Sequence, residues 1–246
     1  MEGKMTEDDL DMEIFKIRHA SILDGIKDAA KKATRDPSGI EVMAVSKFQP
    51  FSAIRIAYNA GLRRFGESRV QEAFGKFMDF RSDCPEASFE MIGHIQSNKA
   101  AKAAGIFDCI QSVDSCELLT ELGRQAAAVR KTIRILLELH TAEDSKAGFS
   151  DKDTLFKACE LMTNSSLSET LIPVGLMTMA PFTQDSGKVR SSFSLCRETF
   201  GEIVSLFDFP SFSTLSMGMS SDYRIAIEEG STLVRIGSAL FGERIP

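Results

Sequence analysis

Residues 40–50 read IEVMAVSKFQP, an apolar run that ends in a lysine and is soon followed by a proline. The run predicts a buried strand over Glu41 to Ser46, and Pro50 prevents it from continuing as a helix. Lys47 at the end of such a strand is unusual, because its ammonium group is costly to desolvate and its pKa falls readily on burial. A lysine amine of lowered pKa is a nucleophile towards an aldehyde, whereas the alternative is a strand-end lysine that reaches solvent.

Seven further short runs of strand-forming residues follow, separated by stretches of helical periodicity. The eight predicted strands are Glu41 to Ser46, Arg63 to Gly66, Ser88 to Ile92, Cys109 to Val113, Thr132 to Leu139, Leu171 to Leu176, Ser213 to Ser216 and Leu233 to Ile236. The helices predicted between them are Phe51 to Ala60, Ser68 to Phe80, Ser97 to Ala104, Ser115 to Arg130, Asp151 to Leu161, Ser186 to Phe207 and Tyr223 to Glu229.

This alternation predicts an α/β fold, a (β/α)8 TIM barrel in a single domain over residues 1–246. An extra N-terminal helix is expected over Asp9 to Thr34, and a short one over Ala239 to Gly242 after the last strand. An open doubly wound sheet is the alternative. It is disfavoured because no G-x-G-x-x-G fingerprint follows the first strand and no linker divides the chain.

The composition favours a small-molecule ligand. The chain has 29 Lys+Arg against 35 Asp+Glu and no basic run, so nucleic acid is not an expected partner. Its five cysteines lie far apart without a C-x-x-C motif, which is typical of a reducing compartment. The acidic N-terminus lacks the apolar region of a signal peptide, and no run approaches the roughly 20 apolar residues of a membrane span. We therefore expect a cytoplasmic protein with no membrane association.

In a TIM barrel the carboxyl ends of the strands meet at one face, where active sites lie. Phosphate sites are often built there from the loops after strands seven and eight. These loops contain Ser216 and Gly218, and Gly237 and Ser238. Ser238 is expected to cap the terminal helix, whose N-terminus favours an anion. The sequence therefore predicts a phosphate cradle on the same face as Lys47.

Arg235 alternates with Val234 and Ile236, so its side chain should point into the barrel mouth. It needs an anion or a ring acceptor there, unless it pairs with a carboxylate such as Glu67. A lysine amine, a phosphate cradle and a third polar group for a ring together describe a pyridoxal 5'-phosphate (PLP) site. Further candidates for contacts with this cofactor, from the ends of strands two, three and seven, are Ser68, His94 and Met217.

With these residues in hand, the chain closely resembles the pyridoxal phosphate homeostasis protein family, which consists of single-domain relatives of the alanine racemase barrel. The matching stretches include Ala44-Val45-Ser46-Lys47, Phe65-Gly66-Glu67, Val70-Gln71-Glu72, Ile92 to Lys99, Ser112-Val113-Asp114, Ser145-Lys146-Ala147-Gly148, Gly175 to Thr178, Leu215 to Ser220, Gly230-Ser231-Thr232 and Val234 to Gly237. The stretches run almost from end to end of the chain.

The resemblance implies that Lys47 forms a Schiff base with PLP, that Ser216, Gly237 and Ser238 contact its phosphate, and that Arg235 faces the pyridine nitrogen. An arginine there would not keep the ring nitrogen protonated, which weakens the ring as an electron sink. His94 lies where the family's loop passes the cofactor, and a histidine that only caps a backbone group is the alternative. The family usually has asparagine and tyrosine where this chain has Ser68 and Arg69, so a contact of that asparagine is in doubt.

The expected function is that of a PLP-binding protein that supports vitamin B6 and amino-acid homeostasis, with PLP and PLP-dependent apoenzymes as partners and little turnover of its own. We expect a monomer. The alternatives are a low-activity PLP-dependent amino-acid racemase and a barrel without a cofactor. The racemase is less favoured because alanine racemases use a tyrosine from a second domain, whereas this sequence has only Tyr58 and Tyr223.

Overall fold

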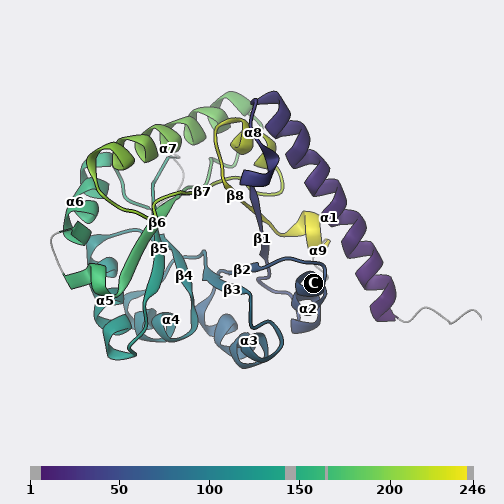
Figure 1. Ribbon diagram of the computed structural model, residues 1–246, viewed down its shortest axis with the longest axis horizontal. Helices are drawn as coiled ribbons and strands as arrows, with labels where there is room; N and C mark the ends of the chain where they lie inside the picture. Colours follow the sequence, from purple (N-terminus) through teal and green to yellow (C-terminus); the bar gives the residue numbers. More distant parts are fainter. Residues whose placement is uncertain (1–6, 142–147, 164–165, 243–246) are drawn as a thin grey trace, which may run out of the picture.

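The computed structural model describes residues 7–141, 148–163 and 166–242, so that Ser145 to Ala147 of one quoted motif lie outside the described residues. Eight parallel strands follow one another in sequence order around a closed barrel, and helices surround it (Figure 1). The last strand pairs with the first, with Met43 opposite Arg235 and Ala44 opposite Ile236. The predicted TIM barrel is therefore confirmed, and this closure excludes the open doubly wound sheet.

The strands are β1 (Glu41–Val45), β2 (Arg64–Glu67), β3 (Ser88–Met91), β4 (Cys109–Val113), β5 (Ile133–Glu138), β6 (Leu171–Met177), β7 (Thr214–Ser216) and β8 (Leu233–Ile236). The α-helices are α1 (Glu7–Lys32), α2 (Phe51–Asn59), α3 (Val70–Asp83), α4 (Ala100–Ile106), α5 (Cys116–Ala128), α6 (Lys152–Thr163), α7 (Ser186–Leu206), α8 (Tyr223–Glu228) and α9 (Ser238–Phe241). Short 3-10 helices are η1 (Pro37–Gly39), η2 (Ser97–Lys99) and η3 (Ser166–Glu169).

The predicted bounds differ from these mainly at helix ends. Residues Ser97 to Lys99 form η2 before α4, and the terminal helix begins at Ser238 instead of Ala239. Pro50 lies at the N-cap of α2 with φ −66, and the helix begins directly after it. Asp185 caps α7 by accepting from the backbone N–H groups of Gly187 and Lys188.

Helix α1 lies outside the barrel, against α8 and α9 (Figure 1). Its buried side chains recur at helical spacing and are Phe15, Ile22, Ile26, Ala29 and Ala30. The sequence alone did not separate these from other apolar residues of the helix, since Ile17 is 69% exposed. The helix therefore closes the side of the molecule where the barrel's first and last strands meet.

The main core lies between the strands and the helices outside them. A run of rings, Phe65, Phe80, Phe89 and Phe107, joins β2, α3, β3 and the end of α4, with centroid separations of 5.5, 4.4 and 5.2 Å. Each such pair contributes about 0.5–1.5 kcal/mol beyond its buried area. A second, small apolar cluster contains Cys109, Leu136, Val174 and Met177. These residues come from β4, β5 and β6, which leaves much of the barrel interior to polar side chains.

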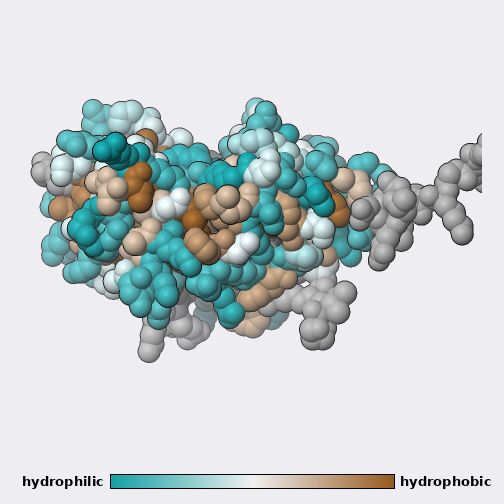
Figure 2. Space-filling model, turned by 90° about the horizontal axis from the view of Figure 1, so that it is seen from below, coloured by the Kyte–Doolittle hydropathy of each residue, from teal (hydrophilic) through white to brown (hydrophobic). Residues whose placement is uncertain are grey.

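The surface seen from below Figure 1 is mainly hydrophilic, with apolar residues scattered over it (Figure 2). On α3, Phe74 and Met78 are exposed, and the ammonium group of Lys102 lies 3.6 Å from the centroid of the Phe74 ring. In the described part of the chain, no helix combines the length and the apolar character that crossing a membrane requires.

Candidate functional site

A cavity of about 480 Å³ lies at the carboxyl ends of the strands, where the sequence placed the site. Five of the predicted site residues line it: Lys47, Ser68, Arg235, Gly237 and Ser238. The other wall residues are Val45, Gln49, Ile92, Met179, Phe182, Met219, Ser220, Ser221 and Gly242. The volume and the mixture of apolar and hydroxyl side chains suit a small polar molecule.

Lys47 is half-buried in a tight turn directly after β1. The N–H of Gln49 donates to the carbonyl oxygen of Ser46 at 3.0 Å, which closes the turn around Lys47. The next residue, Phe48, has φ +63, a left-handed conformation that non-glycine residues rarely adopt. Its N–H donates to Oε1 of Glu72 at 2.5 Å, so helix α3 holds this strained turn from outside.

A second carboxylate, that of Glu67 at the end of β2, supports the same turn. Oε1 of Glu67 accepts from Oγ of Ser46 at 2.7 Å and from Nζ of Lys76 at 3.0 Å. Lys76 also donates to the carbonyl oxygen of Ser46 at 2.9 Å and to Glu72 at 2.7 Å. Burial raises the pKa of Glu67 against the opposing effect of Lys76. Its other oxygen, Oε2, is buried without a hydrogen-bond partner among the described residues.

Ser68 reaches the cavity wall because the chain after β3 passes very close to it. A Cβ atom on Gly93 would lie 2.2 Å from the carbonyl oxygen of Ser68, so only glycine fits there. The carbonyl oxygen of Gly93 in turn accepts from Oγ of Ser112 at 2.6 Å. The spacing of β2 and β3 at the mouth is therefore fixed by backbone contact.

The loops after β7 and β8 form the opposite wall. Gly218 has φ +92, and the N–H of Arg235 donates to its carbonyl oxygen at 2.9 Å. Ser220 and Ser221 follow in the same loop and line the cavity, although sequence reasoning chose neither of them. Ser220 lay within a quoted motif, which was the available signal. The hydroxyl of Ser220 accepts from the N–H of Ala239 at 3.4 Å, which joins the two loops.

The prediction that Ser238 caps the terminal helix is wrong. Helix α9 begins at Ser238 itself, the N-cap is Gly237, and no side chain makes a capping hydrogen bond there. The hydroxyl of Ser238 is therefore not engaged as a helix cap, and the residue lies in the cavity wall.

Arg235 is 3% exposed and points into the mouth, but it does not pair with Glu67. Its Nη1 donates to the carbonyl oxygen of Ser216 at 2.7 Å and to Oγ of Ser216 at 2.8 Å, and its Nη2 donates to the carbonyl oxygen of Thr178 at 2.8 Å. Burial lowers the pKa of Arg235, and Glu138 and Asp222 oppose this effect.

Three predicted site residues lie outside the cavity wall. Ser216 and Met217 are fully buried, and the hydroxyl of Ser216 is engaged with Arg235 and with Oε1 of Gln111, so it faces the barrel interior. His94 is 62% exposed, and its Nδ1 lies 2.8 Å from Oδ2 of Asp114. The hydroxyl of Ser216 thus contacts Arg235, and Ser220, not Ser216, lines the cavity.

Glu138, at the end of β5, is a further buried carboxylate that the sequence analysis did not select. Burial raises its pKa to about 7, although Arg235 lowers it, while Asp114 adds to the increase. A glutamate directly after the apolar run Ile135-Leu136-Leu137 was the signal for it. A carboxyl with a pKa near neutrality is a candidate for proton transfer.

A second hollow of about 530 Å³ adjoins the cavity on the side of α7 and α8. The two share Met179, Phe182, Met219 and Ser221 in their walls. The ring of Phe182 is fully exposed at this junction. The mouth of the barrel therefore continues sideways between the loops after β6 and β7.

The sequence relatives agree with this architecture. The pyridoxal phosphate homeostasis protein of Pseudomonas aeruginosa is 37% identical over 228 residues, which are 92% of this chain and 94% of that protein. The protein of the same name from Escherichia coli is 36% identical over 231 residues, 92% of this chain and 94% of that protein. The chain belongs to the pyridoxal phosphate homeostasis protein family. Residues 19–245 also match the family described as alanine racemase, N-terminal domain.

Two solved structures resemble this member of the pyridoxal phosphate homeostasis protein family over nearly the whole barrel. PipY of Synechococcus elongatus, solved with PLP bound, has a TM-score of 0.79 and 34% identity, covering 93% of this chain and 100% of that one. A protein of unknown function from Bifidobacterium adolescentis has a TM-score of 0.88 and 29% identity, covering 97% of this chain and 98% of that one.

Alanine racemase from Streptomyces coelicolor shares the fold, with a TM-score of 0.70 and 17% identity, covering 95% of this chain and 59% of that one. In this member of the pyridoxal phosphate homeostasis protein family neither tyrosine lines the cavity. Tyr58 lies on α2 under the guanidinium of Arg63. Tyr223 is buried against α1, where a Cβ atom on Gly25 would lie 2.1 Å from its hydroxyl oxygen.

Proposed function

We propose that this chain binds PLP at the mouth of its barrel, holds it as a Schiff base on Lys47, and acts in PLP and amino-acid homeostasis in the cytoplasm. The observation that carries the proposal is that one cavity collects an amine, a guanidinium and several hydroxyl groups from separate strand ends. The PLP-bound structure of PipY, whose sequence is 34% identical, supports the same ligand.

The donor set fits PLP group by group. The cofactor supplies an aldehyde, a phosphate and an electron-withdrawing pyridine ring. Lys47 provides the amine, and Ser220, Ser221 and Ser238 provide hydroxyl donors for the phosphate. Gly237 carries no side chain that would keep the phosphate from the backbone, and a Cβ atom there would meet Val45 at 3.5 Å. Arg235 provides the donor for the ring nitrogen.

Lys47 acts in this proposal through its position. Glu67, Glu72 and Lys76 hold the turn around it. The backbone that carries the amine therefore has a fixed position relative to the aldehyde. Arg235 remains a donor and does not deliver a proton to the ring, which limits the ring's power to stabilise a carbanion. We infer that the chain retains its cofactor and catalyses little turnover.

The test is to locate the attached cofactor. Protein incubated with PLP is reduced with borohydride, which converts a Schiff base into a stable secondary amine, and is then digested for peptide mass spectrometry. We expect the added mass on the peptide containing Lys47, together with a visible absorption band before reduction. Lys47→Arg keeps the positive charge and removes the nucleophile, so both signals should disappear. The matched control Lys27→Arg, at an exposed lysine of α1, should keep them, and a label on any other lysine would refute the assignment.

The proposal of little turnover has its own test. An enzyme of ordinary activity exchanges the α-proton of its amino-acid substrate at roughly 1 per second or faster. We expect the loaded protein to exchange the α-proton of alanine with heavy water far more slowly, because neither tyrosine lines the cavity as a second base. Exchange at the enzymatic rate would favour the racemase.

Transfer to PLP-dependent apoenzymes and a monomeric state remain part of the proposal. A monomer should give a single species of about 27 kDa in analytical ultracentrifugation, with and without PLP. Transfer should appear as loss of the bound band in step with activation of an added apoenzyme, more rapidly than from the same concentration of free PLP.

A further inference from the structure

Arg235 is a buried guanidinium whose hydrogen-bond partners in the described residues are all neutral oxygens. Among the described residues no carboxylate lies within ion-pair distance of it, and its donors go to Ser216 and to the carbonyl oxygen of Thr178. Guanidinium has five N–H donors, and these three hydrogen bonds leave two of them, one on Nε and one on Nη2, for other acceptors. The direction of those two donors depends on how firmly Ser216 is held.

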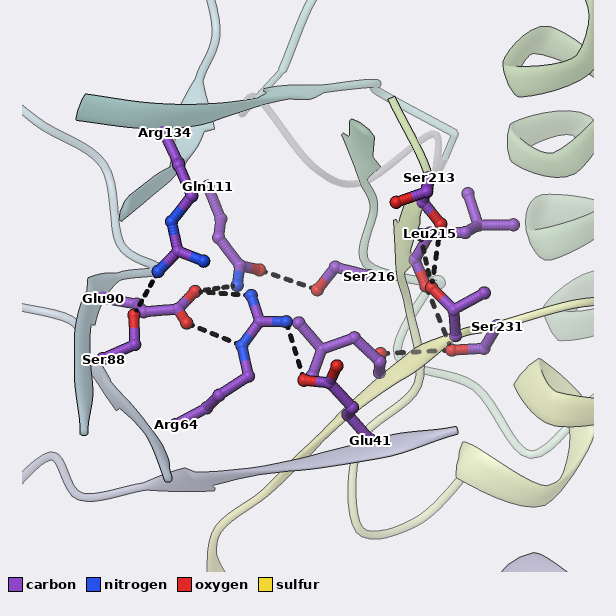
Figure 3. A network of polar contacts seen from close by, with 12 residues as sticks. Glu41, Arg64, Ser88, Glu90, Gln111, Arg134, Ser213, Leu215, Ser216 and Ser231 are labelled. Atoms are coloured by element: carbon purple, nitrogen blue, oxygen red, sulfur yellow. Dashed lines mark hydrogen bonds and ion pairs between the residues drawn. The ribbon is translucent and has the colours of Figure 1, made fainter. Parts of the chain in front are cut away.

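Ser216 is one link in a polar chain that crosses the barrel interior (Figure 3). Its Oγ donates to Oε1 of Gln111 at 2.7 Å, and Nε2 of Gln111 donates to Oε2 of Glu90 at 2.7 Å. Glu90 accepts two hydrogen bonds from Arg64, at 2.7 and 3.0 Å. The side chains of Ser216, Gln111 and Glu90 belong to residues with no exposed surface. The chain thus joins β2, β3, β4 and β7 to Arg235 on β8.

The chemistry of these groups sets the direction of every link. Burial would raise the pKa of Glu90, but Arg64 and Gln111 outweigh it and the pKa is lowered, so Glu90 is an ionised acceptor. The amide of Gln111 must then present its NH2 group to Glu90 and its oxygen to Ser216. Because the proton of Ser216 is committed to that oxygen, its lone pairs face Arg235. Arg235 therefore meets an oriented acceptor.

We propose that Glu90, Gln111 and Ser216 are positioning residues for Arg235, forming a one-way relay of hydrogen bonds that fixes its guanidinium towards the cavity. Gln111 is the decisive link, because its NH2 group donates to Glu90 while its oxygen accepts the proton of Ser216. The lone pairs of Ser216 are then available to Arg235. The relay itself is independent of any ligand, whereas its effect on a bound pyridine ring rests on the proposed function.

Two substitutions of one residue separate orientation from packing. Gln111→Leu keeps a similar volume and removes both links. Gln111→Glu keeps the relay only while the new carboxyl is protonated, since the neutral acid donates to Glu90 and accepts from Ser216 as the amide does. Burial beside an ionised carboxylate raises the pKa of that carboxyl above its usual value near 4.3. The effect of Gln111→Glu on the relay should therefore be absent at low pH and appear as the pH rises.

The first readout is 15N NMR of the Arg235 guanidinium in the full chain without cofactor, assigned by its loss in Arg235→Lys. We expect distinct Nη resonances in the original protein, because three hydrogen bonds restrict rotation. The Nη1 resonances, which report the hydrogen bond to Oγ of Ser216, should shift in Gln111→Leu at every pH and in Gln111→Glu only at high pH, whereas the hydrogen bonds to the backbone carbonyl oxygens of Ser216 and Thr178 remain. Unchanged Arg235 resonances in Gln111→Leu would overturn the proposal, and so would a pH-independent Gln111→Glu protein.

The second readout is the absorption spectrum and affinity of bound PLP. Gln111→Leu should shift the band and raise the dissociation constant about three- to tenfold, the effect of one hydrogen bond. The matched control is Thr199→Val, which removes the hydroxyl of a buried residue on α7 that contacts only the carbonyl oxygen of Leu195, away from the relay. It should change neither readout, and an equal effect there would show a general packing effect and refute the relay.

If the original protein takes up no PLP, the proposed function fails while the NMR result still decides the relay.

Discussion

Nζ of Lys76 donates a hydrogen bond of 2.9 Å to the carbonyl oxygen of Ser46, the residue directly before Lys47. A lysine on the outer helix α3 thus holds the backbone that carries the candidate nucleophile. The same ammonium group contacts Glu67, whose side chain is fully buried. The position of Lys47 is therefore fixed by a second lysine whose own charge is already committed.

Lys76→Met should destabilise the protein by about 3 kcal/mol at neutral pH, because it leaves the buried carboxyl of Glu67 without its cation. The pKa of Glu67, already raised by burial, rises further in the variant. The loss should accordingly be largest above neutrality and shrink as the pH falls and Glu67 takes up a proton. Urea unfolding across this pH range measures it. Lys16→Met, which removes an exposed ion pair with Glu13, should be indistinguishable from the original protein.

Gly93→Ala should lower stability by about 1–3 kcal/mol, since its Cβ atom would lie 2.2 Å from the carbonyl oxygen of Ser68 and must displace it. It should also weaken PLP binding, because Ser68 lines the cavity. Thermal unfolding and a PLP titration report the two effects. Gly75→Ala in α3 has open space around its Cβ position and should be neutral or slightly stabilising. Equal behaviour of the two variants would contradict the assigned contact.

Ser220→Ala should raise the dissociation constant of PLP about three- to tenfold, since it removes one hydroxyl from the proposed phosphate site. The same substitution should leave the affinity for pyridoxal, which lacks the phosphate, almost unchanged. Ser216→Ala should affect both ligands alike, because Ser216 supports Arg235. A phosphate-specific loss in Ser216→Ala would restore the assignment made from the sequence.

Glu138 should make stability depend on pH in a defined direction. Its pKa is about 7 in the folded chain, above the usual value of 4.5. Its contribution is therefore fully present below about pH 4.5 and is lost as the pH rises through about 7, a change of about 3 kcal/mol. Glu138→Gln should remove this dependence, so that it gains stability relative to the original protein between pH 5 and pH 8 in urea unfolding of the cofactor-free chain. A difference that stays constant over this interval would refute the raised pKa.

The sequence predicted the barrel well because its strands are short apolar runs punctuated by turn residues. It also placed Lys47, Arg235, Gly237 and Ser238 on one face, since parallel strands end together. It could not show which way Ser216 faces, because a residue at the last position of a strand can end in the barrel or in the loop. Only the contact with Gln111 from β4 decides this.

The relay in the barrel interior has a signal in the sequence, but the periodicity of the strands does not explain it. Glu90 and Gln111 are polar residues inside runs assigned to buried strands. A buried polar residue needs a partner, but the partner comes from a neighbouring strand whose register the sequence does not reveal. The contacts of Glu72 and Lys76 with the Lys47 turn could not be predicted either. Both residues belong to an amphipathic helix, and in the sequence they look like ordinary surface charges.

The side hollow beside the cavity is large enough for a small molecule of its own, at about 530 Å³, and shares the wall at Phe182 with the cavity. The two cavities are therefore open to each other, and the space next to Lys47 is larger than the first cavity alone. A substitution at Phe182 changes the wall of both cavities at once.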